Sequence, residues 1–363
     1  MKSPVTDDRA KIADTAALER IIGKTPPAIH LKVIDHLDET ALRWIAGSPL
    51  VFAGFGNGTG IAVTLGGGEP GFAQASRSEL RLPLSHLDDA VLARPGLGLG
   101  ALFLLPGIGE TLRVNGRVAS IDAGMAVMAV EECYVHCAKA LIRSGFWSAS
   151  PVKEVPEGTA EFVAASRFIA LATIDADGGA DLSPKGDPAG AMAQIGDGNL
   201  WFADRPGNRR VDSFRNIVAQ PGIGAALLIP GSHDVAIVSG RAHLTTDETA
   251  RSRFAVNGKI PLITVSVDAE IVRRRSAALE RAALWPAMAV EGVDPAAMFV
   301  AHMKLNRNKG FGAKIASAAV AVPGLMRSSG IINPISIEPA SRRKIAYQRF
   351  PARDLLNCVL WVR

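Results

Sequence analysis

The sequence contains an internal repeat over most of its length, and this repeat restricts the chain to folds made of two similar domains. Segments of the first copy return in the same order in the second: residues 48–53 as 166–171, 104–107 as 228–231, 116–117 as 240–241, and Trp147 as Trp285. Both copies consist of short apolar runs between turns rich in glycine and proline, the pattern of β-strands joined by tight turns. We therefore predict a mainly β protein of two tandem domains with short helices.

The repeat divides the chain into four segments. We expect an N-terminal helical arm at residues 1–40, a first domain at 41–150, a second domain at 151–290, and a basic helical extension at 291–363. The extension opens with Asp294-Pro295, a helix cap followed by proline at the first helical position. It either covers the two domains, contacts a second chain, or forms a lid over a substrate pocket.

Composition limits the cellular setting and the class of site. The three cysteines Cys133, Cys137 and Cys358 form no disulfide framework, which indicates a reducing compartment. No second Cys/His pair accompanies the first two, so we expect no metal site. The N-terminus lacks the apolar region of a signal peptide, and the longest apolar runs are too short to span a bilayer. We expect a cytoplasmic protein without membrane contact.

Two polar turns in the second copy bring together groups that bind anions. They are residues 183–188 (SPKGDP) and 204–210 (DRPGNRR), on either side of a predicted strand. Their basic side chains are Lys185, Arg205, Arg209 and Arg210. Arginine grips phosphate with two hydrogen bonds, and Gly207-Asn208 permits a turn that points N–H groups at an anion. The turns fit either a phosphate site or a solvent-exposed basic surface.

These turns, together with residues 130–147 (VEECYVHCAKALIRSGFW), resemble the pyridoxamine phosphate oxidase-like FMN-binding split-barrel family, in its branch with SPRGDP, DRPGN and HCAKA motifs. The resemblance covers roughly residues 40–286. It implies two tandem split barrels that form an internal pseudo-dimer, with FMN held by its phosphate in the basic loop between them. It also implies an oxidoreductase that acts on a small organic molecule and uses NAD(P)H or another electron donor.

The two copies differ at the motifs that carry the resemblance. Opposite SPKGDP the first copy has LGGGEP, so that Ser183 faces Leu65 and Lys185 faces Gly67, and the DRPGNRR loop has no counterpart. Conversely, the HCAKA motif is absent from the second copy: with Val130 aligned on Val267, His136 faces Arg273 and Lys139 faces Ser276. Each half thus keeps the motif that the other lacks. We predict one FMN site per chain; independent decay of both motifs in a protein that binds no cofactor is the alternative.

The resemblance assigns residues to this site. The residues expected to bind the cofactor are Ser183, Lys185, Asp204, Arg205, Asn208, Arg209, Arg210 and Trp147, and those expected to take part in the chemistry are His136, Lys139 and Arg143. Lys139 or Arg143 is the candidate for a basic group near N1 of the flavin. His136 fits acid–base work or a structural hydrogen bond equally well. Because Trp285 persists in the copy without HCAKA, packing explains Trp147 at least as well as flavin contact.

Other functions remain open at this point. The alternative function is that of a flavin- or haem-binding protein without turnover, since related split barrels bind haem. A haem would need an axial ligand such as His86, His136, His233 or His302. Nucleic-acid binding by the basic extension is not favoured, because the extension lacks interleaved aromatic residues and a helix-turn-helix pattern. An internal pseudo-dimer is compatible with a monomer, and the extension with a homodimer.

Overall fold

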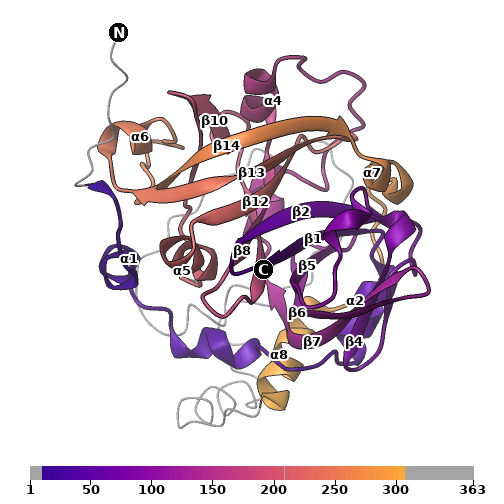
Figure 1. Cartoon of the computed structure of the whole chain (residues 1–363). Coiled ribbons are helices and arrows are strands. Elements are labelled where there is room, and N and C mark those ends of the chain that lie inside the picture. Colours follow the sequence, from indigo (N-terminus) through magenta and orange to yellow (C-terminus); the bar gives the residue numbers. More distant parts are fainter. Residues whose placement is uncertain (1–9, 208, 307–363) are drawn as a thin grey trace, which may run out of the picture.

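The computed structural model describes residues 10–207 and 209–306, and in this part of the chain two seven-stranded antiparallel sheets dominate (Figure 1). The first sheet contains β1 (Leu50–Asn57), β2 (Gly60–Gly67), β3 (Gln74–Ala75), β4 (Glu79–Pro83), β5 (Gly98–Leu104), β6 (Thr111–Asp122) and β7 (Met125–His136). The second contains β8 (Phe168–Ile174), β9 (Ala180–Gly186), β10 (Ala193–Gly196), β11 (Asn199–Ala203), β12 (Gly222–Leu228), β13 (Asp234–Thr245) and β14 (Thr264–Arg275). The strand orders are β2-β1-β5-β6-β7-β4-β3 and, read in the same direction, β9-β8-β12-β13-β14-β11-β10. This identical order confirms the predicted mainly β fold of two tandem barrels.

Short helices occupy equivalent places in the two copies. The helices are α1 (Thr15–Ile22), η2 (Pro27–Lys32), α2 (Glu39–Gly47), η3 (Leu84–His86), η4 (Ala90–Leu92), α3 (Lys139–Ser144), α4 (Thr159–Ala165), α5 (Asp212–Ala219), α6 (Glu248–Ser252), α7 (Ala277–Ala282) and α8 (Pro295–Leu305). Helices α2 and α4 precede the first strand of each barrel, and α3 and α7 follow the last.

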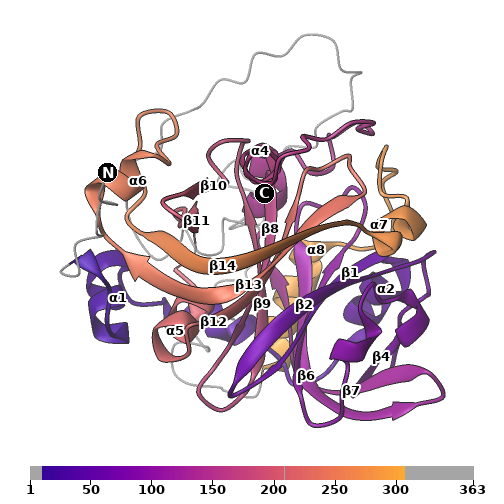
Figure 2. The same ribbon diagram turned by 45° about the horizontal axis from the view of Figure 1, so that its top comes forward.

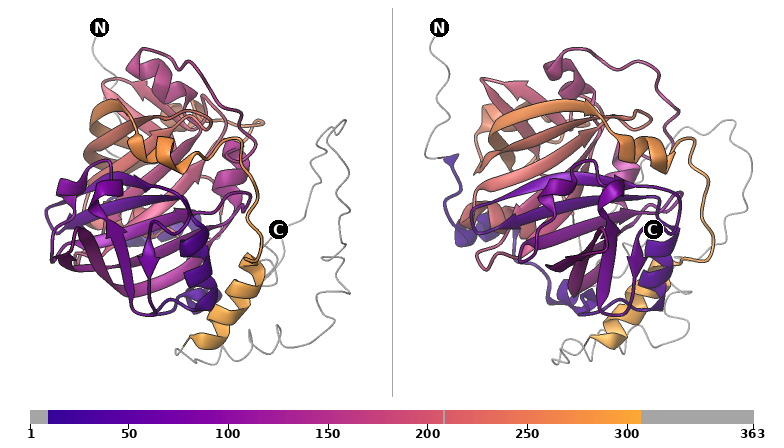
Figure 3. Two further views of the ribbon diagram at one scale, coloured as in Figure 1. Left: turned by 90° about the vertical axis from the view of Figure 1, so that its right-hand side faces the viewer. Right: turned by 45° about the vertical axis from the view of Figure 1, so that its right-hand side comes forward.

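The start of the C-terminal extension is helical, as its sequence predicts. The side chain of Asp294 accepts hydrogen bonds from the N–H groups of Ala296 and Ala297, and Pro295 begins α8. The buried His302 of α8 lies 3.1 Å from the carbonyl oxygen of Lys32 and 3.4 Å from a carboxylate oxygen of Asp38, so α8 packs against the N-terminal arm beside the first barrel (Figure 3). The remainder of the extension lies outside the described residues.

The central strands are buried on both faces, because each barrel packs against the other. In β1, Val51, Ala53 and Phe55 point into the first barrel's own core, whereas Leu50 and Phe52 belong to a cluster shared with the second barrel. In β8, Phe168, Ala170 and Ala172 join the same shared cluster. Figures 2 and 3 show the two barrels side by side along this seam. Two-sided burial explains why these strands are continuous apolar runs rather than alternating ones.

The strand register corrects the alignment of SPKGDP in the second copy with LGGGEP in the first by one residue. Phe52 pairs with Leu65, and its equivalent Ala170 pairs with Pro184. Leu65 therefore corresponds to Pro184, Ser183 to Thr64, and Lys185 to Gly66. The reason is that the hairpin turn between β8 and β9 is longer than the turn between β1 and β2, and a one-residue change in a hairpin moves every later side chain by one position.

The register also corrects the alignment around the HCAKA motif. His136 pairs with Thr111, whose equivalent in the second barrel is Val235, and Val235 pairs with Arg274. His136 therefore corresponds to Arg274 rather than to Arg273, and Lys139 corresponds to Ala277. The β6–β7 pairing contains a register shift between Asn115 and Gly116 of β6 that is absent from the β13–β14 pairing, so the two valines used for alignment are not equivalent.

The seam between the barrels should be sensitive to the loss of aromatic packing. Phe146 is fully buried, and its ring centroid lies 5.1 Å from that of Phe168 and 5.2 Å from that of Trp285. Replacing Phe146 with alanine should lower the free energy of unfolding by about 3–5 kcal/mol, measured by urea denaturation, because it leaves a cavity in the seam. Phe146→Leu should cost less than half as much; equal costs for the two variants would contradict a packed aromatic seam.

Candidate functional site

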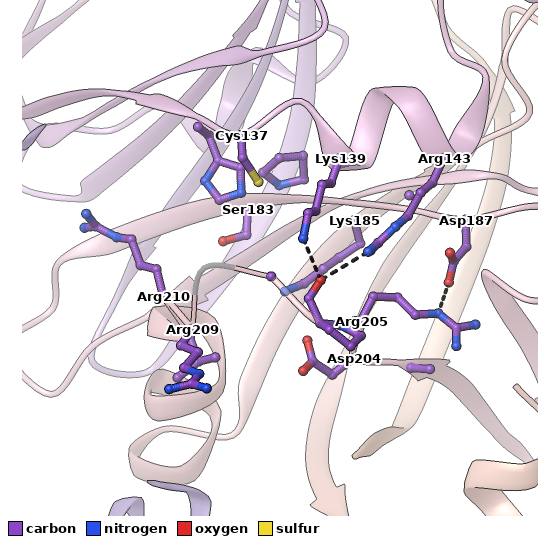
Figure 4. Close-up of a pocket in the computed structure, with 18 of the residues that line it drawn as sticks. Cys137, Lys139, Arg143, Ser183, Lys185, Asp187, Asp204, Arg205, Arg209 and Arg210 are labelled. Atoms are coloured by element: carbon purple, nitrogen blue, oxygen red, sulfur yellow. Dashed lines mark hydrogen bonds and ion pairs between the residues drawn. The ribbon is translucent and has the colours of Figure 1, made fainter. Parts of the chain in front are cut away.

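A cavity of about 330 Å³ lies between the two barrels, where the end of β7 and α3 of the first meet β9 and the loop after β11 of the second. It brings together most of the residues singled out in the sequence (Figure 4). Those that line it are His136, Lys139, Arg143, Ser183, Lys185, Asp204, Arg205, Arg209 and Arg210. Asn208 lies outside the described residues, and Trp147 does not line this cavity. The motifs retained by the two halves thus face one shared space.

A glycine allows the two barrels to approach each other at this site. A Cβ atom on Gly186, the last residue of β9, would collide with the carbonyl group of Ala140 in α3. Only the absence of a side chain lets the helix of one barrel lie directly on the strand of the other. The glycine of SPKGDP, Gly186, and the second alanine of HCAKA, Ala140, are therefore the two sides of one contact.

The helix α3 also holds the basic loop of the second barrel. Nζ of Lys139 and a terminal guanidinium nitrogen of Arg143 each donate to the carbonyl oxygen of Pro206 over 3.1 Å (Figure 4). Burial, followed by the nearby Arg143 charge, lowers the pKa of Lys139 to about 8. Lys139 is consequently the cation in this wall of the cavity whose charge changes just above neutral pH.

The cations of the second barrel divide into paired and unpaired groups. Arg205 forms an ion pair with Asp187 and donates to the carbonyl oxygen of Ala191 over 3.3 Å. Lys185 lies over the ring of Phe214, with Nζ 4.5 Å from the ring centroid, and burial lowers the pKa of its ammonium group. Among residues 10–207 and 209–306, no carboxylate oxygen lies within ion-pair distance of Lys185. Its charge is therefore available to an anionic ligand.

Arg209 and Arg210, neighbours in sequence, have different environments. Arg209 is exposed and takes the left-handed conformation (φ 60°), which residues with a side chain rarely adopt, and its carbonyl oxygen accepts from Thr25 Oγ1 over 2.8 Å. The side chain of Arg210 is buried: its guanidinium lies 4.1 Å from the ring centroid of Tyr134 and pairs with Asp212. Figure 4 shows this group directed away from Lys185 and Arg205.

Three buried residues behind Arg210 were not found by sequence reasoning. Tyr134 is fully buried, and Arg113, which pairs with Asp181, lies 4.9 Å from the centroid of its ring. Lys32 from the arm donates to the carbonyl oxygen of Val135 over 2.7 Å, and burial lowers its pKa to about 7. A charged residue within an apolar strand, as Arg113 is in β6, is the signal that could have revealed this cluster.

His136, one of the residues that line the cavity, has an unsatisfied ring nitrogen. Its Nδ1 is buried and has no hydrogen-bond partner within the described part of the chain. Burial, reinforced by the charges of Arg113 and Lys32, holds the pKa of His136 well below its usual range. The ring is therefore neutral at pH 7, with a nitrogen available to a polar ligand.

Trp147 lies on another surface of α3. Its Nε1–H donates to the carbonyl oxygen of Ile108 over 2.6 Å, and its ring meets that of Phe146 edge-on with centroids 4.9 Å apart. These contacts support the packing interpretation of the two equivalent tryptophans.

The pseudo-symmetric position in the other half is filled by protein. The carboxylate of Asp88 accepts from Ser276 Oγ and from the N–H of Ala278 in α7, over 2.5 and 2.8 Å. Arg281 donates to the carbonyl oxygens of Gly67 and His86 over 2.9 and 2.8 Å. Two of the cations that line the cavity have no counterpart there, since Lys185 corresponds to Gly66 and Lys139 to Ala277. The duplicated interface thus carries the assembled set of cations on one side.

Comparison with known proteins agrees with this architecture. Residues 155–283 match the family model described as pyridoxamine 5'-phosphate oxidase. The second barrel is a pyridoxamine phosphate oxidase-like split barrel. The first barrel repeats its strand order, so the chain is a tandem duplication of this fold.

Solved structures of other proteins show local likeness to this chain. HupZ of Group A Streptococcus is 21% identical over 31% of this chain and 88% of its own (TM-score 0.25), and an F420 reductase is 18% identical over 33% and 98% (TM-score 0.25). General Stress Protein 26 of Bacillus anthracis str. Sterne is 18% identical over 30% and 90% (TM-score 0.23). No curated protein matches the sequence.

Two kinds of feature are absent from the described residues. None of the helices in residues 10–207 and 209–306 is long and apolar enough to cross a membrane. Within the same residues, no group of three or more His, Cys, Asp and Glu side chains is arranged to hold a metal ion.

Two of the three arginines of the basic loop, Arg205 and Arg209, should differ in their effect on stability. Arg205→Met leaves the buried Asp187 carboxylate without its partner and should lower the free energy of unfolding by about 3–5 kcal/mol. Arg209→Met removes an exposed side chain and should change it by about 0.5 kcal/mol or less. Urea denaturation measures both. The double variant Arg205→Met/Asp187→Leu should recover most of the loss; a double variant as unstable as Arg205→Met would rule out a paired role.

Proposed function

We propose that the chain binds one FMN in the cavity between its barrels and is an FMN-dependent oxidoreductase acting on a small organic molecule. The observation that carries this proposal is the convergence of the motifs: each barrel retains only some of them, and the retained residues line one cavity. The family of the second barrel supports the cofactor class. Because both halves of the site belong to one chain, a monomer suffices.

The residues that line the cavity fit the chemistry of FMN. A phosphate dianion requires cations and hydrogen-bond donors, and the cavity is lined by Lys185, Lys139 and Arg209 together with the hydroxyl-bearing Ser183. Ser183 is nearly buried and lies 3.0 Å from the hydroxyl of Ser213, which orients it. Arg205 and Arg210, which the sequence placed beside the phosphate, are paired with Asp187 and Asp212 and are proposed to fix the loop.

The protein's own contribution to the chemistry is electrostatic. Bound FMN would supply the acceptance and donation of hydride, with NAD(P)H or another donor as the electron source. Lys139 places a positive charge in the cavity at neutral pH, which favours an anionic cofactor and any negative charge that develops near it. The neutral His136 offers a ring nitrogen for a hydrogen bond to cofactor or substrate.

The visible spectrum of the purified protein tests the proposal first. We expect flavin absorption bands and about one FMN released per chain. Two FMN per chain would contradict the single complete site. A Soret band after reconstitution with haem, in a protein that does not bind FMN, would favour the haem alternative.

Removal of the unpaired lysine should weaken FMN binding. Lys185→Met should raise the dissociation constant about 10- to 100-fold, the effect of one lost charge-assisted hydrogen bond, measured by quenching of flavin fluorescence. Lys259→Met removes an exposed lysine that does not line the cavity and should leave the constant unchanged. Unaltered affinity in Lys185→Met would contradict the placement of the phosphate.

FMN affinity should fall as the pH rises through about 8, because Lys139 loses its proton there. A bound phosphate favours the protonated lysine, so the dissociation constant should increase by up to about tenfold per pH unit above this pKa. Arg at position 139 keeps its charge, so Lys139→Arg should reduce the slope between pH 7 and 9.5. An identical pH profile for the two proteins would count against Lys139 as the titrating group.

A further inference from the structure

Two arginines occupy equivalent positions in the two halves of the pseudo-dimer. Ala140 in α3 lies directly over Gly186, and Ala278 in α7 lies in the same way over Gly67. Gly186 and Gly67 are equivalent in strand register, since they pair with Phe168 and Leu50, the first residues of β8 and β1. Three residues beyond each alanine stands an arginine, so Arg143 and Arg281 correspond to each other.

Both arginines make the same contact across the seam. A terminal nitrogen of Arg143 donates to the carbonyl oxygen of Pro206 over 3.1 Å, and a terminal nitrogen of Arg281 donates to that of His86 over 2.8 Å. Pro206 is the third residue after β11, and His86 is the third residue after its equivalent β4. The contact is therefore present in the half that lacks the SPKGDP and DRPGNRR motifs as well as in the half that has them.

Lys139 behaves differently from Arg143 in this comparison. Lys139 also donates to the carbonyl oxygen of Pro206, but its equivalent in the other half is Ala277. In that half, Arg281 contacts the loop, and it donates to the carbonyl oxygens of both His86 and Gly67. A contact that persists where the cavity residues are missing is explained by structure. A lysine present only beside the cavity is explained by what the cavity does.

We infer that Arg143 is a positioning residue that holds residues 204–207 of the second barrel against α3 of the first, and that Lys139 is the functional group α3 contributes to the cavity. The contact itself does not depend on the identity of the ligand. That it positions a cofactor-binding loop rests on the proposed function.

Trypsin cleavage after Arg209, in the full-length protein without FMN, measures the opening of this loop. Arg143→Ala should increase the cleavage rate about tenfold, equivalent to about 1.4 kcal/mol of loop stability, because a charge-assisted hydrogen bond is lost. The matched variant Arg281→Ala breaks the same contact in the other half and should leave this rate within about twofold of the wild type. Arg143→Lys, which keeps a charged donor, should restore part of the protection.

Lys139→Ala gives α3 the residue found at the equivalent place in α7. It should weaken FMN binding about tenfold or more, whereas the cleavage rate after Arg209 should rise less than in Arg143→Ala, because Arg143 still donates to Pro206. A cleavage rate as fast as that of Arg143→Ala would overturn the division of roles. Equal cleavage rates in Arg143→Ala and Arg281→Ala would overturn it too. Should every variant fail to bind FMN while the cleavage pattern holds, the proposed function fails and the positioning role stands.

Discussion

Burial of both faces of the central strands is the constraint on which the rest of the structure depends. Each barrel covers apolar side chains that point away from the core of the other. These are Leu50 and Phe52 in β1 and Phe168 and Ala170 in β8. A single barrel would leave this apolar surface in water, so each half requires the other. The seam also fixes the cavity, because α3 can reach the second barrel only where Gly186 lets it rest on β9.

The cavity is positively charged because only some of the cations that line it form ion pairs with carboxylates. Arg205 forms an ion pair with Asp187, and Arg210 forms one with Asp212. Removing one partner of such a pair would leave the other as an uncompensated buried charge, which costs stability. Lys185 is held over an aromatic ring, a weaker compensation than a carboxylate. A row of arginines in a sequence therefore overstates the charge available to a ligand. What a ligand meets is the charge that remains after the loop has stabilised itself.

The fold and the meeting of the motifs followed from the sequence, whereas the exact partners of each side chain did not. The repeat of turn and strand segments was sufficient for the tandem architecture, because strand order follows from the order of apolar runs and turns. The alignment within motifs was wrong by one residue, since a longer hairpin and a register shift in β7 leave no clear mark in the sequence. The cluster around Tyr134 joins Lys32 and Arg113 from distant segments, and no local pattern predicts such a meeting.

Asymmetry between the halves is what makes the duplication informative. In a pair of identical barrels, both copies of an interface carry the same residues, and a structural contact cannot be told from a functional one by comparison. Here the carboxylate of Asp88 accepts hydrogen bonds from Ser276 and Ala278 at the equivalent interface, so protein groups satisfy one another there. The contacts common to both sides, the glycine beneath the helix and the arginine above the loop, are those needed to join two barrels. The residues found only beside the cavity are those that the joining of barrels does not explain, and Lys185 and Lys139 are therefore the strongest candidates for recognising a ligand.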